Sequence, residues 1–405
     1  MRLEDLDDPM RVWHYAERYL GEKTRIYSRF ADDADVSAAC HPQRGAESFT
    51  LPSFLVPAGR GELVTNNVAS TLPSHYQVAE HLVLPVHPDT LSFEGLAGRE
   101  ELLRCEAGPP LEVVPLANTR TVSVLEVDGE PAVPHMLKLH YPRRLSRFTR
   151  QQHQEELALQ LWVAEQLAVA GVPLLTDVCA GVFGSGGQGW GFLVREPPAL
   201  SADTGLFTVP LFALYGQDLH APADRSLLEQ LVAAAGEPAG DYITERIVRP
   251  MVRLWTQTLL ATGCALELHG QNTLVSFTPD GRHLQILYRD CEIHTDPGLR
   301  ARKGLPPGQL PPASVISRDV PFTAAAVFSL TYDSFMGHAL DRLAALAYDR
   351  LGLSPAVLHE AARHTFRNSG LQEDLLPPTV HYYGDAPYTG DHFQLVDTGH
   401  PPLWR

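Results

Sequence analysis

The segment spanning residues 267–290, ELHGQNTLVSFTPDGRHLQILYRD, is the most informative stretch of this chain for both fold and chemistry. Residues 272–277 have strand composition, a Pro-Asp-Gly turn follows, and residues 284–289 form a second strand, so the pattern predicts a β-hairpin. A hairpin brings its two ends together, so Asn272 and Asp290 can share a metal ion. Amide and carboxylate oxygens are hard ligands suited to Mg²⁺ that also holds nucleotide phosphates.

His269 and Gln271 precede the hairpin and would face the same phosphates. The alternative interpretation is a loop histidine with satisfied hydrogen bonds in front of an ordinary surface hairpin. The segment alone does not decide between them, and the rest of the chain favours the phosphate site.

Composition limits the classes of partner. The chain has 405 residues and a formal charge of −16, enough length for two or three lobes and a large core. The negative field argues against binding to nucleic acid or to an anionic membrane, but it leaves ATP open, because a few local cations can hold its phosphates. We therefore expect small-molecule substrates as partners.

The sequence also indicates a compartment. The N-terminus lacks the apolar core of a signal peptide, and no apolar run reaches membrane-spanning length. The five cysteines are an odd, scattered set without a C-x-x-C pair, which argues against a disulfide framework or a structural zinc site. We expect a soluble cytoplasmic protein.

The pattern along the chain predicts a mixed α+β protein in four regions. These are a poorly periodic N-terminal region (1–80), a β-rich nucleotide-binding lobe (81–200), a region with the loop and hairpin (201–300), and a helical lobe with a C-terminal tail (301–405). Strands are predicted at 81–86, 111–115, 121–127, 136–141 and 192–195, and helices at 151–170, 247–262, 322–351 and 356–367. The Gly-rich segment 181–191 precedes a strand and lacks a Lys-Ser/Thr ending, which favours a hairpin turn over a phosphate-binding loop. Residues 305–312 read as a Pro-rich loop.

Three cations are candidates to face the phosphates. Arg120 lies at the mouth of one predicted strand. Lys138 lies within the next strand, which is expected to pair antiparallel with the first across the Asp128 turn. There Leu137 and Leu139 face the core, and the lysine faces the opposite side. Arg150 is predicted to begin the long helix, whose N-terminal N–H groups favour anions. The neighbouring arginines are interpreted as a solvated surface cluster: Arg143, Arg144 and Arg147.

These residues carry a family resemblance. The chain contains, in order, Val86-His-Pro, Arg120-Thr121, a lysine followed twelve residues later by an arginine, E-x-H-x-Q-N from Glu267, and Arg-Asp closing at Asp290. The series resembles the NRPS-independent siderophore (NIS) synthetases, the IucA/IucC-like superfamily. The E-x-H-x-Q-N element followed by Arg-Asp is the specific part, and the likeness covers about residues 80 to 300.

The resemblance implies a fold and an activity. It implies a hand-like arrangement of fingers, palm and thumb, with ATP in an antiparallel β-rich palm and a helical C-terminal lobe. It also implies an ATP-dependent ligase that adenylates a small carboxylic acid, commonly citrate. An amine or alcohol then attacks to give an amide or ester, with release of AMP and pyrophosphate, in siderophore or related natural-product biosynthesis. A homodimer is the assembly that the resemblance implies.

The resemblance also assigns roles. Contacts to ATP fall to eight residues: Arg120, Lys138, Arg150 and His269 as catalytic groups, and Asn118, Thr121, Gln271 and Asn272 as nucleotide contacts. Glu267, Asn272 and Asp290 would surround Mg²⁺. Fixed cations and a metal stabilise the charge that gathers when a carboxylate attacks the α-phosphorus.

The chain departs from the family pattern in several places. It is shorter than family members, with the loss at the N-terminus, and Cys40-His-Pro-Gln43 is at most a remnant of the G-H-P-x-H-P-x-x-K element expected there. Asn118 replaces the usual Ser, and Asp89 replaces an aromatic residue after His-Pro. These differences affect the acid and amine pockets more than the nucleotide site.

Two rival functions remain. His269-Gly-Gln271, an Asn, a hairpin and Asp290 also resemble the loop of small-molecule kinases, in which an Asp accepts the substrate proton. Here Gln271 stands at that position and is not a base, which favours the ligase. A non-catalytic scaffold that retains the fold is the third interpretation.

Overall fold

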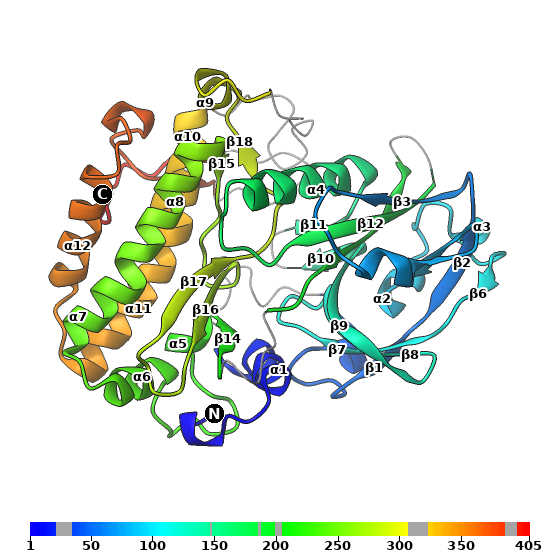
Figure 1. The fold of residues 1–405 in the computed structure, drawn as a ribbon, viewed down its shortest axis with the longest axis horizontal. Helices are drawn as coiled ribbons and strands as arrows, with labels where there is room; N and C mark the ends of the chain where they lie inside the picture. Colours follow the sequence, from blue (N-terminus) through cyan, green and yellow to red (C-terminus); the bar gives the residue numbers. More distant parts are fainter. Residues whose placement is uncertain (22–34, 146–147, 185–187, 199–204, 307–322, 385–394) are drawn as a thin grey trace.

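The computed structural model describes residues 1–21, 35–145, 148–184, 188–198, 205–306, 323–384 and 395–405. Within them the chain is a mixed α+β fold, as predicted: antiparallel sheets dominate the first half, and helices dominate the last third (Figure 1). Most of the predicted Pro-rich loop at 305–312 and the middle of the Gly-rich turn at 181–191 lie outside the described residues.

A seven-stranded antiparallel sheet forms the largest β layer. Its strand order is β1 (Phe49–Leu51), β7 (Leu111–Pro115), β8 (Thr121–Val127), β9 (Glu130–Leu139), β13 (Trp190–Arg195), β12 (Asp177–Phe183) and β3 (Gly61–Thr65). The predicted pairing of β8 with β9 is confirmed, with Thr121 opposite Lys138. Strand β9 begins earlier than predicted, because its first residues extend the hairpin with β8 outward.

A smaller sheet covers one face of the large one. It consists of β4 (Gln77–Val78), β5 (His81–Pro85), β2 (Ser53–Pro57) and β6 (Glu106–Ala107). Val122, Leu137 and Leu139 belong to the buried cluster that also includes side chains of this smaller sheet. Alternation along β9 therefore places Lys138 on the opposite face of the large sheet. The pairing of β1 with β7 and of β2 with β5 crosses the boundary drawn at residue 80.

Helix α4 (Gln154–Val169) covers the opposite face, where Leu157 and Leu161 pack against the side chains of β12 and β13. It ends before Gly171, whose φ of +70° is the left-handed conformation expected there. Its start is three residues later than predicted. The chain first forms a hairpin of β10 (Tyr141–Leu145) and β11 (Phe148–Arg150). The prediction that Arg150 begins the helix is therefore wrong, because Arg150 belongs to strand β11 and pairs with β10.

The predicted hairpin at 272–290 is confirmed. Strands β16 (Thr273–Phe277) and β17 (Leu284–Tyr288) pair antiparallel, with Thr273 opposite Tyr288, and β14 (Phe207–Pro210) adds a third strand. Gly281 adopts φ +67° in the connecting turn. A second pair, β15 (Cys264–Ala265) and β18 (His294–Thr295), joins the segments just before and after this sheet.

The helices gather beside this sheet, as Figure 1 shows for α7, α8, α11 and α12. Trp255 of α8 is fully buried and packs edge to face on Tyr332, with ring centroids 4.9 Å apart.

In the described part of the chain, no helix is both long and apolar enough to cross a membrane. The predicted helices are confirmed within a larger set: α5 (Phe212–Tyr215), α6 (Leu227–Ala235), α7 (Ala239–Ile243), a π-helix (Thr244–Val248), α8 (Arg249–Thr262), α9 (Pro297–Arg302), α10 (Ala324–Ser329), a second π-helix (Leu330–Met336), α11 (Gly337–Leu351) and α12 (Pro355–Arg367).

The remaining elements are short. Helices α2 (Pro88–Leu91) and α3 (Arg99–Leu102) follow β5, and 3₁₀ turns lie at Leu3–Asp5, Ala38–Cys40, Leu72–Tyr76 and Glu373–Leu375. The tail forms β19 (His381–Tyr383) and β20 (Leu395–Asp397), and its Trp404 is buried in the helical core.

Helix α1 (Pro9–Tyr19) was not predicted. Asp8 caps it by accepting a hydrogen bond from the Arg11 amide at 2.7 Å, and Pro9 suits its first turn. Its buried face includes the charged side chains of Glu17 and Arg18 beside Trp13. The few apolar residues of this helix do follow the helical period, but the helix is short and low in apolar content, so the sequence pattern is easily overlooked.

Candidate active site

The site is organised around Lys138, whose side chain leaves β9 toward α4 and the end of the β16–β17 hairpin. Its Nζ donates to Gln160 Oε1 at 2.7 Å, to Asp290 Oδ1 at 2.7 Å and to Glu292 Oε2 at 3.0 Å. The lysine is 1% exposed. The structure thus brings Lys138 and Asp290 into contact, from segments 152 residues apart in sequence.

Asp290 follows β17 and adopts φ +85°, a conformation that costs energy for any residue other than glycine. Burial alone would raise the pKa of its carboxyl, but Lys138 and Arg195 hold that pKa well below its usual range. Arg195 lies 3.9 Å from Asp290 Oδ1 and forms two hydrogen bonds with the buried Asp177 at 2.6 and 3.0 Å. Asp290 therefore remains a carboxylate.

Arg120 lies beside this group, at the start of β8. One of its terminal nitrogens donates to the Arg150 carbonyl at 2.9 Å, and the other lies 3.6 Å from Glu292 Oε2. Burial lowers the pKa of Arg120 to about 10, against the opposing effect of Glu292, and the guanidinium keeps its charge at neutral pH. Arg120 and Arg150 thus lie close to each other, as two like charges arranged around an acidic group.

The loop before β16 presents His269 toward the same region. A Cβ on Gly270 would lie 2.3 Å from the Tyr215 hydroxyl oxygen, so only glycine fits this turn. His269 Nδ1 accepts the Gln271 amide at 3.2 Å, which places the ring proton on Nε2. Burial lowers the pKa of His269 to about 3, so the ring is a neutral hydrogen-bond donor.

Glu267 completes an acidic group with Asp290 and Glu292. Burial, together with the negative charges of those two carboxylates, raises the pKa of Glu267 to about 8. Asn272 is buried nearby, and its main-chain carbonyl accepts a hydrogen bond from the Arg289 main-chain amide at 3.0 Å. Glu267 and Asp290 bring carboxylate oxygens and Asn272 brings an amide oxygen, which are the hard donors that Mg²⁺ takes, so these residue types fit the predicted ion.

The acidic residues of the site are nevertheless spread apart. In the part of the chain that the structure describes, only Cys40, His87 and Asp89 bring three Cys, His, Asp or Glu ligand atoms within 4.8 Å of one another. A wide spacing suits Mg²⁺, because proteins hold this ion through one or two carboxylates plus substrate phosphates and waters.

Asn118 and Thr121 have structural contacts. Asn118 Oδ1 accepts the Thr121 amide at 2.8 Å and closes the turn between β7 and β8. The Thr121 hydroxyl is buried and has no hydrogen-bond partner among the described residues. The role of both residues as nucleotide contacts stays a prediction.

Helix α1 fixes the backbone around the site through Glu17. This buried carboxylate pairs with Arg289 and accepts the Ala117 amide at 3.1 Å. Arg289 also donates to the Gln271 carbonyl at 3.0 Å, and its guanidinium lies over the Trp13 ring. Glu17 therefore links the turn beside Asn118 to the loop that carries His269.

Several site residues escaped the sequence analysis: Glu292, Gln160, Glu17 and the Arg195–Asp177 pair. Glu292 had a weak signal, because it lies two residues beyond Asp290 in the segment that directly follows the hairpin. Gln160 and Glu17 had none, since a single polar residue on a helix is indistinguishable from a surface position.

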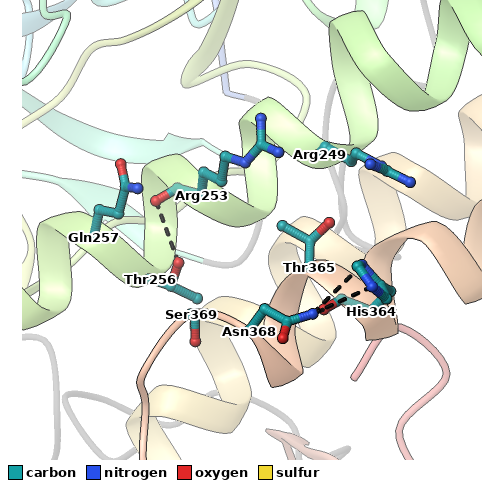
Figure 2. A pocket seen from close by; sticks show the side chains of 8 residues that line it. All are labelled: Arg249, Arg253, Thr256, Gln257, His364, Thr365, Asn368 and Ser369. Carbon is teal, nitrogen blue, oxygen red and sulfur yellow. Dashed lines mark hydrogen bonds between the residues drawn. The ribbon is translucent and has the colours of Figure 1, made fainter.

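A separate pocket of about 230 Å³ lies between α8 and the end of α12 (Figure 2). None of the predicted site residues lines it. Its walls are polar: Arg249, Arg253, Thr256, Gln257, His364, Thr365, Asn368 and Ser369.

Comparison with known protein families gives a match to part of the chain. A family model described as "Ferric iron reductase FhuF-like transporter" matches residues 241–370, which include the His269 loop, the hairpin and most of the helical lobe. A search of curated proteins finds no match.

Solved structures give a broader likeness. ATP-bound aerobactin synthetase IucA from a hypervirulent pathotype of Klebsiella pneumoniae aligns with a TM-score of 0.64 and 16% identity, over 94% of this chain and 74% of that one. Aerobactin synthetase IucC from the same source gives 0.62 and 17%, over 91% and 70%. The petrobactin biosynthesis protein AsbB from Bacillus anthracis str. Sterne gives 0.62 and 13%, over 88% and 67%. This chain therefore has the fold of the NIS synthetases, as the sequence resemblance implies.

Proposed function

We propose that this protein is an ATP-dependent synthetase that adenylates a small carboxylic acid and condenses it with an amine or alcohol. AMP and pyrophosphate are released, and the product belongs to siderophore or related natural-product biosynthesis. The observation that carries the proposal is the enclosed charge group in which Lys138 contacts Asp290 and Glu292. The fold shared with aerobactin synthetases supports it.

The cations have a defined task in this reaction. When a carboxylate attacks the α-phosphorus, two anions approach each other and negative charge gathers on the phosphate oxygens. Arg120, Lys138 and Arg150 supply fixed positive charge for those oxygens, and neutral His269 supplies a hydrogen bond through Nε2. Removing one preorganised contact of this kind costs on the order of 3 kcal/mol in barrier height.

The acidic residues have a complementary task. Asp290, Asn272 and Glu267 would hold Mg²⁺, which when bound offsets phosphate charge. Asp290 and Glu292 also hold the Lys138 ammonium in place, so that little reorganisation is needed during the reaction. The condensation step then depends mainly on keeping the nucleophile beside the activated acyl group.

The proposal predicts AMP and pyrophosphate as products. The full chain is incubated with Mg-ATP and panels of carboxylic acids and amines, and the nucleotides are separated by chromatography. AMP that forms only with acid present supports the ligase. ADP as the main product would show a phosphotransferase, and no turnover with any pair would favour the scaffold.

Gln271→Asp tests the rivalry within the loop. In a ligase, an added negative charge beside the phosphates lowers AMP formation, and the product stays AMP. In a kinase with an altered loop, the new carboxylate supplies the missing base and ADP formation on a hydroxyl substrate rises. Gln271→Asn is the matched control, since it shortens the side chain without adding charge.

A further inference from the structure

A second group of ligand-type side chains lies outside the charge group around Lys138. Cys40 ends a 3₁₀ turn, His87 caps the short helix α2, and Asp89 lies within that helix. One ligand atom from each lies within 4.8 Å of the others, and the residues are 3%, 0% and 6% exposed. The sequence shows them only as two separate His-Pro segments, Cys40-His-Pro and Val86-His-Pro, 46 residues apart.

Two hydrogen bonds fix the orientation of the Asp89 carboxylate, as is usual for carboxylates that bind metal ions. Asp89 Oδ2 accepts the Tyr141 hydroxyl at 2.8 Å and the Ser37 amide at 3.0 Å. Burial would raise the pKa of Asp89, but these hydrogen bonds lower it below its usual value, so the group is ionised. Hydrogen bonds of this kind around a liganding carboxylate fix its orientation.

The imidazole in the group is incompletely satisfied. His87 Nδ1 lies 4.0 Å from Asp89 Oδ2 and accepts the Asp89 amide at 3.1 Å. Nε2 is buried and has no hydrogen-bond partner among the described residues. Because Nδ1 accepts a hydrogen bond, the ring proton lies on Nε2. Nδ1, the nitrogen that faces Asp89, is therefore the one whose lone pair an ion would take over from the Asp89 amide.

We propose that Cys40, His87 and Asp89 bind a divalent transition-metal ion of the zinc class. Thiolate, imidazole and carboxylate are the donors that Zn²⁺ takes, whereas a thiolate is a poor ligand for Mg²⁺. Bonds of about 2.0–2.3 Å in a tetrahedron bring donors to about 3.5 Å from one another, so the side chains need to close by about an ångström.

Binding of the ion releases one proton from the protein. Cys40 releases its thiol proton to solvent and binds as thiolate, and Asp89 binds as the carboxylate it already is. His87 Nδ1 presents its lone pair to the ion in place of the hydrogen bond from the Asp89 amide, and the ring proton stays on Nε2. The three protein ligands leave a fourth position for water. The ion would tie the segment before β1 to the start of α2.

Cobalt is the probe for this site. Metal-free full-length protein is titrated with Co²⁺ in excess Mg²⁺, which occupies sites made of oxygen donors only. We expect one equivalent of Co²⁺ to bind, with tetrahedral visible bands and a thiolate-to-cobalt band in the near ultraviolet. Elemental analysis of protein purified without chelator should find one zinc per chain.

Variants locate the ion. Cys40→Ser should abolish the thiolate band, and Cys105→Ser, a cysteine outside the group, should keep it. Tyr141→Phe, which removes one hydrogen bond to Asp89, should weaken cobalt affinity about 10–100-fold.

If Cys40→Ser fails to fold, His87→Gln replaces it, with folding checked by circular dichroism in chelator. Wild-type protein that binds no stoichiometric Co²⁺ or Zn²⁺, or binding unchanged in a folded ligand variant, overturns the proposal. Neither result bears on AMP formation.

Discussion

Lys138 is a cation enclosed by two carboxylates and an amide oxygen, so its charge and theirs depend on one another. Lys138→Met keeps the length of the side chain but leaves Asp290 and Glu292 without their shared cation. We expect a loss of about 3 kcal/mol in the free energy of unfolding, measured by urea denaturation. AMP formation should fall at least about 100-fold, because a fixed charge at the phosphates is gone.

A double variant separates the two effects. Lys138→Met with Glu292→Gln removes one negative charge along with the positive one, so part of the lost stability should return while AMP formation stays low. If Lys138→Met unfolds at the same urea concentration as wild type, the buried charge group is not formed in solution.

Helix α1 acts as an element that positions the site through Glu17 and Arg289. Glu17→Gln leaves the buried guanidinium without its counter-charge, and we expect a loss of about 3 kcal/mol in unfolding free energy. Because Arg289 also fixes the loop of His269, kcat for AMP formation should fall more than KM rises.

Arg11→Ala is the matched control on the same helix, because Arg11 is exposed and its ion pair is with the exposed Asp7. It should change stability by less than about 1 kcal/mol and leave kcat unchanged. Equal effects of the two substitutions would show that α1 contributes general stability and no positioning.

At the scale of the whole molecule, Mg-ATP should raise the melting temperature, because it binds the folded chain alone. The stabilisation is about 2.7 kcal/mol when the ligand is at 100 times its Kd. Asp290→Asn should reduce the shift measured by calorimetry. Asn is the right substitution at φ +85°, since it tolerates this backbone better than Ala does. An undiminished shift would remove Asp290 from the nucleotide site.

Stability should also fall at acidic pH, through histidines buried as neutral rings. Burial lowers the pKa of His135 to about 4 and that of His140 to about 3. Below pH 6.5 the unfolded chain binds protons that the folded chain does not. Stability is therefore full above pH 6.5 and is lost as the pH falls toward 4, by up to about 3 kcal/mol for His135.

Urea denaturation at pH 7 and pH 5 measures this loss. His135→Gln should flatten the dependence, and His283→Gln, at an exposed turn, should leave it unchanged. A free energy of unfolding that rises on acidification would contradict the assignment.

Local pattern was enough to predict the strand pair β8–β9, the hairpin from residue 272 to Asp290, and the long helices. Alternation, turn residues and helical periodicity act over a few residues and can be read directly from the sequence. The position of Lys138 on the face opposite Leu137 and Leu139 followed from the same alternation. Helix α1 was missed although its apolar residues follow the helical period, because the helix is short and low in apolar content.

The sequence by itself therefore determined the elements, the hairpin and the residue types available for phosphate chemistry. Only the tertiary structure decided which charges meet: Glu292 with Lys138 across 154 residues, Glu17 with Arg289 across 272, and Arg150 in a strand beside Arg120. The physical reason is that strand and helix formation depend on neighbouring residues. The partner of a buried charge depends instead on how whole elements pack, and no local pattern records this.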